Sequence, residues 1–194
     1  MKLRIIQDHD AESPREWDNL GTIAYKLSGY TLGEERIGDP IEWLEGMLDL
    51  APKYEYTNER LSELEDKFYE RFIALPLYLY DHSGISISTS PFGCRWDSGK
   101  VGYIYVTKEK VREEYGWKRI TKEREEDILT YLDGGIKTLD QYLQGDVYRF
   151  TLEDDGEEID SCGGFYGDDW KMNGMADHIE RELHDQLEVG EIEY

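Results

Sequence analysis

Alternating apolar and polar residues predict β-strands in the middle of the chain. Ile85 and Ile87 alternate with serines, and Ile104 and Val106 alternate with tyrosines, as in strands with one buried face. The apolar run LPLYLY precedes these segments, and the turn-forming sequence DHSG follows that run. We therefore expect three strands that form an antiparallel meander over residues 77–106.

A β-hairpin and a further strand are predicted closer to the chain ends. Asp155-Gly156, a dipeptide typical of type I′ turns, separates the two strand-like segments of the hairpin 146–163. Residues 2–7 (KLRIIQ) have the short alternating pattern of another strand. Because an isolated two-stranded hairpin is only marginally stable in water, we expect this hairpin to join the meander in one antiparallel sheet.

Apolar residues three and four positions apart predict helices between these strands. Asp39-Pro40 combines an N-cap with a proline at the first helical position. Thr57 is a suitable N-cap for a longer helix, whose apolar stripe reaches Leu75 and ends before Pro76.

Four more helical segments are expected in the second half of the chain. Thr107 and Thr121 are suitable N-caps, and Gly134 is a suitable exit for the helix that Thr121 begins. A short helix that ends near Gly145 and a C-terminal helix over residues 173–188 complete the pattern.

The whole pattern predicts an α+β fold. Segment 22–25 is compatible with both strand and helix. No repeat, linker or low-complexity tract interrupts the sequence, so we expect a single domain over residues 1–194. Its architecture would be an antiparallel sheet, made of the meander and the hairpin, with helices packed on it.

The net charge of the chain indicates which class of partner it binds. The 194 residues include 44 Asp and Glu but only 22 Lys and Arg, a net charge of −22, well beyond the roughly 2 to 8 that solubility requires. Aromatic residues make up 13% of the chain, which indicates a packed core rather than a disordered acidic segment. Such a charge repels nucleic acid and anionic membranes, and it favours a basic host protein or nucleoprotein complex as partner.

The negative charge is concentrated in the C-terminal quarter of the sequence. Residues 151–194 contain 15 acidic and 2 basic side chains, a net charge of −13. The predicted hairpin turn and the predicted C-terminal helix bring many of these carboxylates close together. We therefore expect the partner to bind to the following residues: Glu153, Asp154, Asp155, Glu157, Glu158, Asp168, Asp169, Asp177, Glu180 and Asp185.

Two cysteines are the other candidates for chemistry. A thiol becomes reactive beside a base or a cation, so Cys94 with the nearby His82 is a candidate pair, and Cys162 is a second candidate thiol. The alternative is that both cysteines are small structural side chains. Neither interpretation of the cysteines assigns a catalytic residue.

The sequence predicts neither a metal nor a cofactor. A structural zinc site needs four ligands at recognisable spacing, which the cysteines and histidines do not provide. Asp8, Asp10 and Glu12 offer oxygen ligands for a divalent cation, and a solvated surface is the alternative for them. The P-loop, the dinucleotide-binding glycine motif and the Gly-x-Ser-x-Gly elbow do not occur.

Three stretches of the sequence carry a family resemblance. They are ESPREWDNLGT (12–22), residues 80–116 with WDSGKVGYIYV, and residues 145–169 with DSCGGFYGDD. They resemble a family of small uncharacterised proteins that bacteriophages, plasmids and integrated mobile elements encode. The resemblance implies a mobile element in a bacterial host and no catalytic residue. Small acidic proteins of such elements often inhibit restriction enzymes or CRISPR complexes. The step from them to this chain is made by analogy.

Charge and resemblance together predict a non-enzymatic inhibitor of host defence. Its carboxylates would mimic nucleic acid and occupy the basic surface of an anti-CRISPR or anti-restriction target. The start of the sequence has no apolar segment of a secretory signal, and we expect the bacterial cytoplasm with reduced thiols. Two alternatives stay open. One is a small enzyme that acts on a nucleotide or a protein through Cys94 or a carboxylate site. The other is a structural or housekeeping phage protein with incidental acidity.

Overall fold

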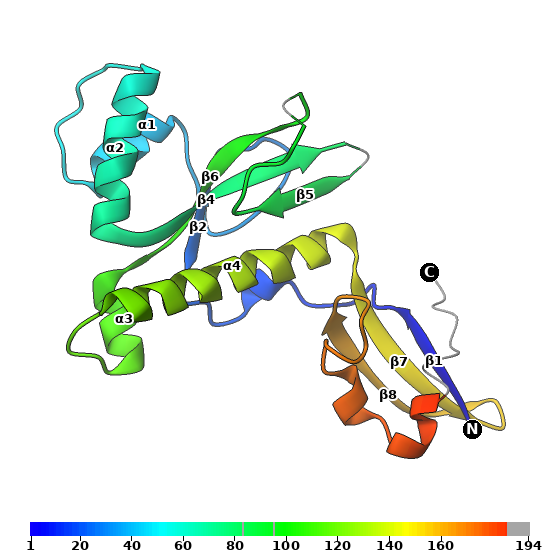
Figure 1. Ribbon diagram of the computed structural model, residues 1–194. Helices are drawn as coiled ribbons and strands as arrows, with labels where there is room; N and C mark the ends of the chain where they lie inside the picture. Colours follow the sequence, from blue (N-terminus) through cyan, green and yellow to red (C-terminus); the bar gives the residue numbers. More distant parts are fainter. Residues whose placement is uncertain (83, 95, 186–194) are drawn as a thin grey trace. The chain divides into compact units, whose positions relative to one another are not determined.

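The computed structural model describes residues 1–82, 84–94 and 96–185 (Figure 1). The chain divides into two compact units. The central unit is Trp17–Lys137, and the terminal unit combines Met1–Glu16 with Thr138–Tyr194. Helices and largely antiparallel strands occur in the chain, so the predicted α+β class is confirmed. One domain on one sheet was expected, whereas each unit has its own sheet.

The central unit contains a five-stranded sheet with the order β3-β2-β6-β4-β5. Its strands are β2 (Thr22–Tyr25), β3 (Glu35–Arg36), β4 (Phe72–Asp81), β5 (Ile85–Ser88) and β6 (Ser98–Thr107). Strand β3 runs parallel to β2, and the other pairs are antiparallel. The predicted meander is wrong in its order, because β4 and not β5 lies between the other two strands.

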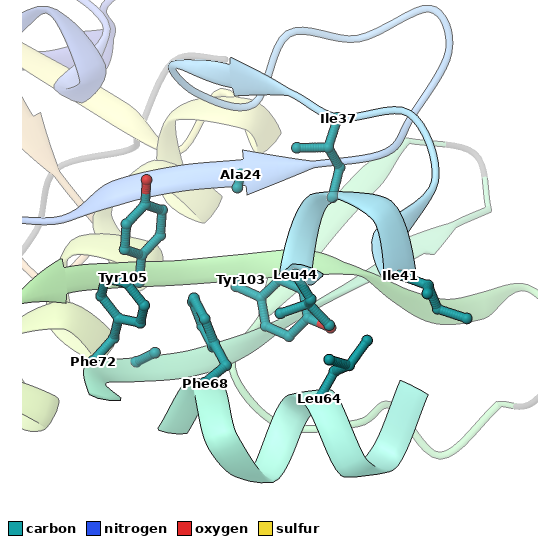
Figure 2. Packing of buried hydrophobic residues seen from close by; sticks show 10 residues of the cluster. Ala24, Ile37, Ile41, Leu44, Leu64, Phe68, Phe72, Tyr103 and Tyr105 are labelled. Atoms are coloured by element: carbon teal, nitrogen blue, oxygen red, sulfur yellow. The ribbon is translucent and has the colours of Figure 1, made fainter. Parts of the chain in front are cut away.

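Two short helices cover one face of this sheet. Alternation directs Ala24, Tyr103 and Tyr105 to the same face, where α1 (Pro40–Met47) and α2 (Asn58–Arg71) pack on them (Figure 2). Trp43 of α1 stacks on Tyr103, with ring centroids 5.5 Å apart. The buried residues of this core are Ala24, Ile37, Ile41, Leu44, Leu64, Phe68, Phe72, Ala74, Tyr103 and Tyr105.

The predicted N-caps Asp39 and Thr57 are confirmed, but the predicted end of the helix that Thr57 begins is wrong. Asp39 Oδ1 accepts a hydrogen bond from the backbone N–H of Ile41, and Thr57 Oγ1 accepts one from Arg60. Helix α2 ends at Arg71, so Pro76 lies inside β4, opposite Tyr103. Strand β5 pairs with β4 only from Tyr78 onward, so β4 is an edge strand at the proline, where a missing N–H is tolerated.

The sequence between Thr121 and Gln144 forms one helix and not two. After α3 (Lys108–Tyr115), α4 (Lys122–Gln144) continues through Gly134 and Gly135, so the predicted exit at Gly134 is wrong. Two interior glycines cost about 2 kcal/mol relative to alanine. The helix nevertheless continues, because apolar residues at helical spacing are buried on both sides of the glycines. These residues are Ile128, Leu132, Ile136 and Leu139.

The terminal unit contains a three-stranded antiparallel sheet with the order β1-β7-β8. Its strands are β1 (Lys2–Gln7), β7 (Val147–Asp154) and β8 (Glu157–Tyr166). The hairpin therefore does not join the meander, and the single-sheet prediction is wrong. Strand β1 provides the third strand that the hairpin needs for stability. The buried core comprises Leu3, Ile5, Tyr148, Phe150, Phe165, Met175, Ile179 and Leu183.

The predicted C-terminal helix is also wrong in part. Residues 175–183 form two short 3₁₀ helices, η2 (Met175–His178) and η3 (Arg181–Leu183), while η1 (Pro14–Glu16) precedes the central unit. Ile179 between them is extended, and neither helix has a side-chain N-cap hydrogen bond. The apolar residues at helical spacing are still buried, because two short turns deliver them to the core. Glu188, the predicted end, lies outside the described residues.

Candidate partner-binding surface

The turn of the β7–β8 hairpin gathers carboxylates in pairs. Asp155 and Gly156 both have positive φ angles, 49° and 87°, as the predicted type I′ turn requires. The two rungs next to the turn pair Glu153 with Glu158 and Asp154 with Glu157. Like charges directly opposite each other destabilise a sheet, so both rungs oppose hairpin formation electrostatically. We name residues 153–159 the acidic tip.

Neighbouring cations compensate only part of this charge. The Arg4 guanidinium lies 3.4 Å from a Glu153 oxygen, and the Met1 amino group lies 3.3 Å from an Asp154 oxygen. Both pairs are partly exposed and therefore weak. Within the described part of the chain, Asp155 and Glu157 have no ion pair, and both are exposed. The acidic tip thus presents net negative charge to solvent.

An exposed isoleucine lies among these carboxylates. Glu158 lies opposite Glu153, and Asp160 lies opposite Leu152, so Ile159 is an extra residue in a β-bulge. Its side chain is 54% exposed. Protein interfaces commonly combine an apolar contact with a polar rim. Ile159 is not evident from the sequence, because strand alternation alone does not reveal a bulge.

The other carboxylates that were predicted to bind the partner lie in the terminal unit, outside residues 153–159. Strand β8 is 10 residues long, which at about 3.3 Å per residue places roughly 30 Å between the turn and the segment after the strand. Asp168 and Asp169 lie at that far end and are exposed. Glu180 and Asp160 line the same cavity of about 50 Å³, so Glu180 approaches strand β8. Asp177 and Asp185 are exposed elsewhere on the C-terminal segment.

Cys94 and His82 both approach the carboxylate of Asp97, which was not among the predicted site residues. The Cys94 thiol lies 3.6 Å from Asp97 Oδ2, and His82 Nδ1 lies 3.9 Å from the same oxygen. The Cys94 thiol therefore contacts this carboxylate, and the carboxylate also approaches the His82 imidazole. The three-residue spacing of Cys94 and Asp97 in a loop is the sequence signal that points to this contact. A reactive role of Cys94 with His82 stays a prediction.

Cys162 and Asp8 lie next to a glycine pair in the terminal unit. Cys162 lies opposite Phe150 and packs partly buried against the core. Beyond it, Gly163 and Gly164 form a second bulge, where Asp8 Oδ2 accepts a 2.8 Å hydrogen bond from the Gly164 N–H. A Cβ atom at Gly163 would lie 2.3 Å from the same oxygen. The close approach of Asp8 therefore explains Gly163, and a positive φ angle of 79° explains Gly164.

The acidic N-terminal loop does not assemble a ligand set. Asp8 Oδ1 accepts a hydrogen bond from the backbone N–H of Asp10, so both Asp8 oxygens are engaged. Across residues 1–82, 84–94 and 96–185, no three His, Cys, Asp or Glu side chains come together as metal ligands would. The geometry does not favour the cation alternative for Asp8, Asp10 and Glu12.

The chain was compared with protein families, curated proteins and solved structures. No family model, no curated protein and no solved structure matches the chain. Of the helices in the described residues, none is both long and apolar enough to cross a membrane.

Proposed function

We propose that this protein is an inhibitor that binds the basic, nucleic-acid-binding surface of another protein through the acidic tip. The observation that carries the proposal is the pair of consecutive rungs in which carboxylate faces carboxylate, Glu153 with Glu158 and Asp154 with Glu157. This arrangement costs folding free energy in the isolated protein. A surface lined with Lys and Arg would remove the repulsion and replace it with attraction.

The tip has the features that such a contact needs. Its charge lies at one end of the three-stranded sheet, where the turn residues are exposed and accessible to a partner. Complementary charge accelerates association, and close pairs can contribute net affinity when they are desolvated. Ile159 adds an apolar contact within the charged surface.

The resemblance to mobile-element proteins directs the proposal to bacterial defence. Restriction and CRISPR complexes hold nucleic acid in basic grooves, and an acidic hairpin would compete for such a groove. The carboxylates at the tip would then occupy positions that phosphates otherwise hold.

The test is a charge reversal at the tip with a matched reversal elsewhere. The protein is first used to capture a partner from a bacterial lysate, and binding of the purified partner is measured with and without duplex DNA. Reversal of Asp154, Asp155, Glu157 and Glu158 to Lys should weaken binding at least tenfold. The control reverses Glu113, Glu114, Glu123 and Asp127, exposed residues of the central unit, which gives the same net charge.

Salt and DNA provide the second readout. Binding of the parent protein should fall steeply between about 50 and 200 mM salt, and DNA should compete with it. If the tip variant and the control variant bind equally well, the acidic tip is only a solvated surface and the proposal is wrong. A Cys94→Ser variant should bind like the parent, and selective loss of function in it would instead favour the enzyme alternative.

A further inference from the structure

A small cavity in the central unit has charged residues on an otherwise apolar lining. Its volume is about 130 Å³, and it lies where strands β2 and β6 meet the helices α1 and α2. Ile37, Pro40 and Leu61 provide apolar walls, while Lys26, Lys100 and Glu65 provide the charges. Two lysines in one cavity are notable in a chain with twice as many acidic as basic residues.

One of the two lysines is neutralised within the protein. Glu65 Oε1 accepts hydrogen bonds from Lys100 Nζ and from the Tyr103 hydroxyl, both at 2.6 Å. Lys100 Nζ also lies 4.3 Å from the centroid of the Tyr103 ring. Burial, and then the hydrogen bond to Glu65, raises the pKa of Tyr103, so its hydroxyl remains a donor. These three groups form a closed network with no net charge.

The other lysine, Lys26, has no ion-pair partner within the described residues. Lys26 is exposed, whereas Ile37, Gly102 and Tyr103 of the same cavity are buried. Lys26 therefore lines the exposed side of the cavity, and buried residues line the rest. Because Lys100 and Glu65 cancel, the cavity carries one unit of positive charge.

We infer that this cavity binds a small organic monoanion, a carboxylate whose apolar part is about the size of one six-membered ring. An apolar protein cavity of about 150 Å³ accommodates benzene, so the present volume suits a ligand of this size. The carboxylate would pair with Lys26, and the ring would contact Ile37, Pro40 and Leu61. Recognition by a few polar groups on an apolar lining is typical of small-molecule sites.

The charges of the cavity exclude other ligand classes. A cation of the same size would meet the unpaired Lys26 ammonium group. A phosphate dianion has no apolar part to fill the volume, and it would bring two negative charges to a site that offers one. The site does not involve the acidic tip, so it stands or falls independently of the proposed function.

The experiment uses the full chain labelled with ¹⁵N and titrated with benzoate, which is the probe. Saturable shifts are expected at the backbone amides of Lys26, Val101, Gly102 and Tyr103. Benzylamine has the same ring with the opposite charge, and it should give no saturable shifts there. Equal binding of benzylamine, or no saturation with benzoate at millimolar concentration, would overturn the inference.

Three variants separate the contribution of charge from that of space. Lys26→Met should weaken benzoate binding about tenfold, because it removes one charge-assisted contact. Lys118→Met is the matched control, since Lys118 is exposed in the same unit but does not line the cavity. Leu61→Trp fills the cavity without a change of charge and should abolish binding. Unchanged affinity in Lys26→Met would also overturn the inference, whatever the tryptophan variant does.

Discussion

Arg60 Nη2 lies 2.7 Å from Glu45 Oε1, and each of the two side chains is only 3% exposed. The pair connects α2 to α1 above the sheet of the central unit. Arg60 Nη1 also lies 2.9 Å from Glu63 Oε2, and the hydrogen bond to Glu45 is the main cause that raises the pKa of Arg60. A buried charge without its partner is costly, so this pair controls how the two helices pack.

Removal of one member of this pair should be severely destabilising. Glu45→Ala leaves the buried Arg60 guanidinium with the half-exposed Glu63 as its remaining ion-pair partner, and we expect a loss of about 2 to 3 kcal/mol in the free energy of unfolding. Urea denaturation measures the loss. The matched control is Glu109→Ala, which breaks an exposed pair with Arg112 and should cost less than about 1 kcal/mol. Similar losses in both variants would show that the buried pair is unimportant.

Relief of repulsion at the acidic tip should stabilise the protein. Glu157→Lys converts the Asp154–Glu157 rung into an attractive pair, with an expected gain of about 0.2 to 1 kcal/mol at low salt. The gain should shrink at high salt because the pair is exposed. Asp168→Lys makes the same charge change at the other end of β8 and is the control. If both variants gain equally, general charge reduction and not the rung is responsible.

The Gly163–Gly164 bulge should depend on Asp8. A methyl group at Gly163 must displace the Asp8 carboxylate, so Gly163→Ala should destabilise the protein by about 1 to 3 kcal/mol. The same substitution in an Asp8→Ala background should cost less, because the obstructing oxygen is absent. Thermal unfolding of the two single variants and the double variant measures this coupling. Strictly additive losses would argue against the contact.

Alkaline pH should unfold the central unit. Burial is the first cause that raises the pKa of Tyr69, Tyr103 and Tyr105, and hydrogen bonds to carboxylates add to it for the last two. The folded state therefore keeps these phenols protonated, while the unfolded state ionises them near pH 10. Their contribution to stability is complete below pH 10 and is lost as the pH rises above it.

Absorbance at the tyrosinate band and circular dichroism test this together. Part of the tyrosine ionisation should coincide with loss of the folded spectrum. Tyr103→Phe should move that transition to higher pH, because one buried ionisable group is removed. Complete tyrosine ionisation without any loss of folded structure would contradict the expectation.

Local features of the fold could be predicted because adjacent residues determine them. Asp39 and Thr57 cap their helices through hydrogen bonds to backbone groups two and three residues away. The Asp155-Gly156 turn depends only on the φ angles that these two residues tolerate. The acidic composition of the candidate site was equally visible, since it is a count along the sequence.

The tertiary structure alone decided how these elements combine. Strand β1 pairs with β7 across more than 140 residues of sequence, and this pairing, rather than the hairpin's own pattern, separated the two sheets. The carboxylate rungs and the Ile159 bulge depend on strand register, and the Arg60–Glu45 pair depends on how two helices pack. Hydrophobic alternation specifies which side of a strand is buried, but many partners can bury it equally well. The choice among them is a property of the whole packed chain.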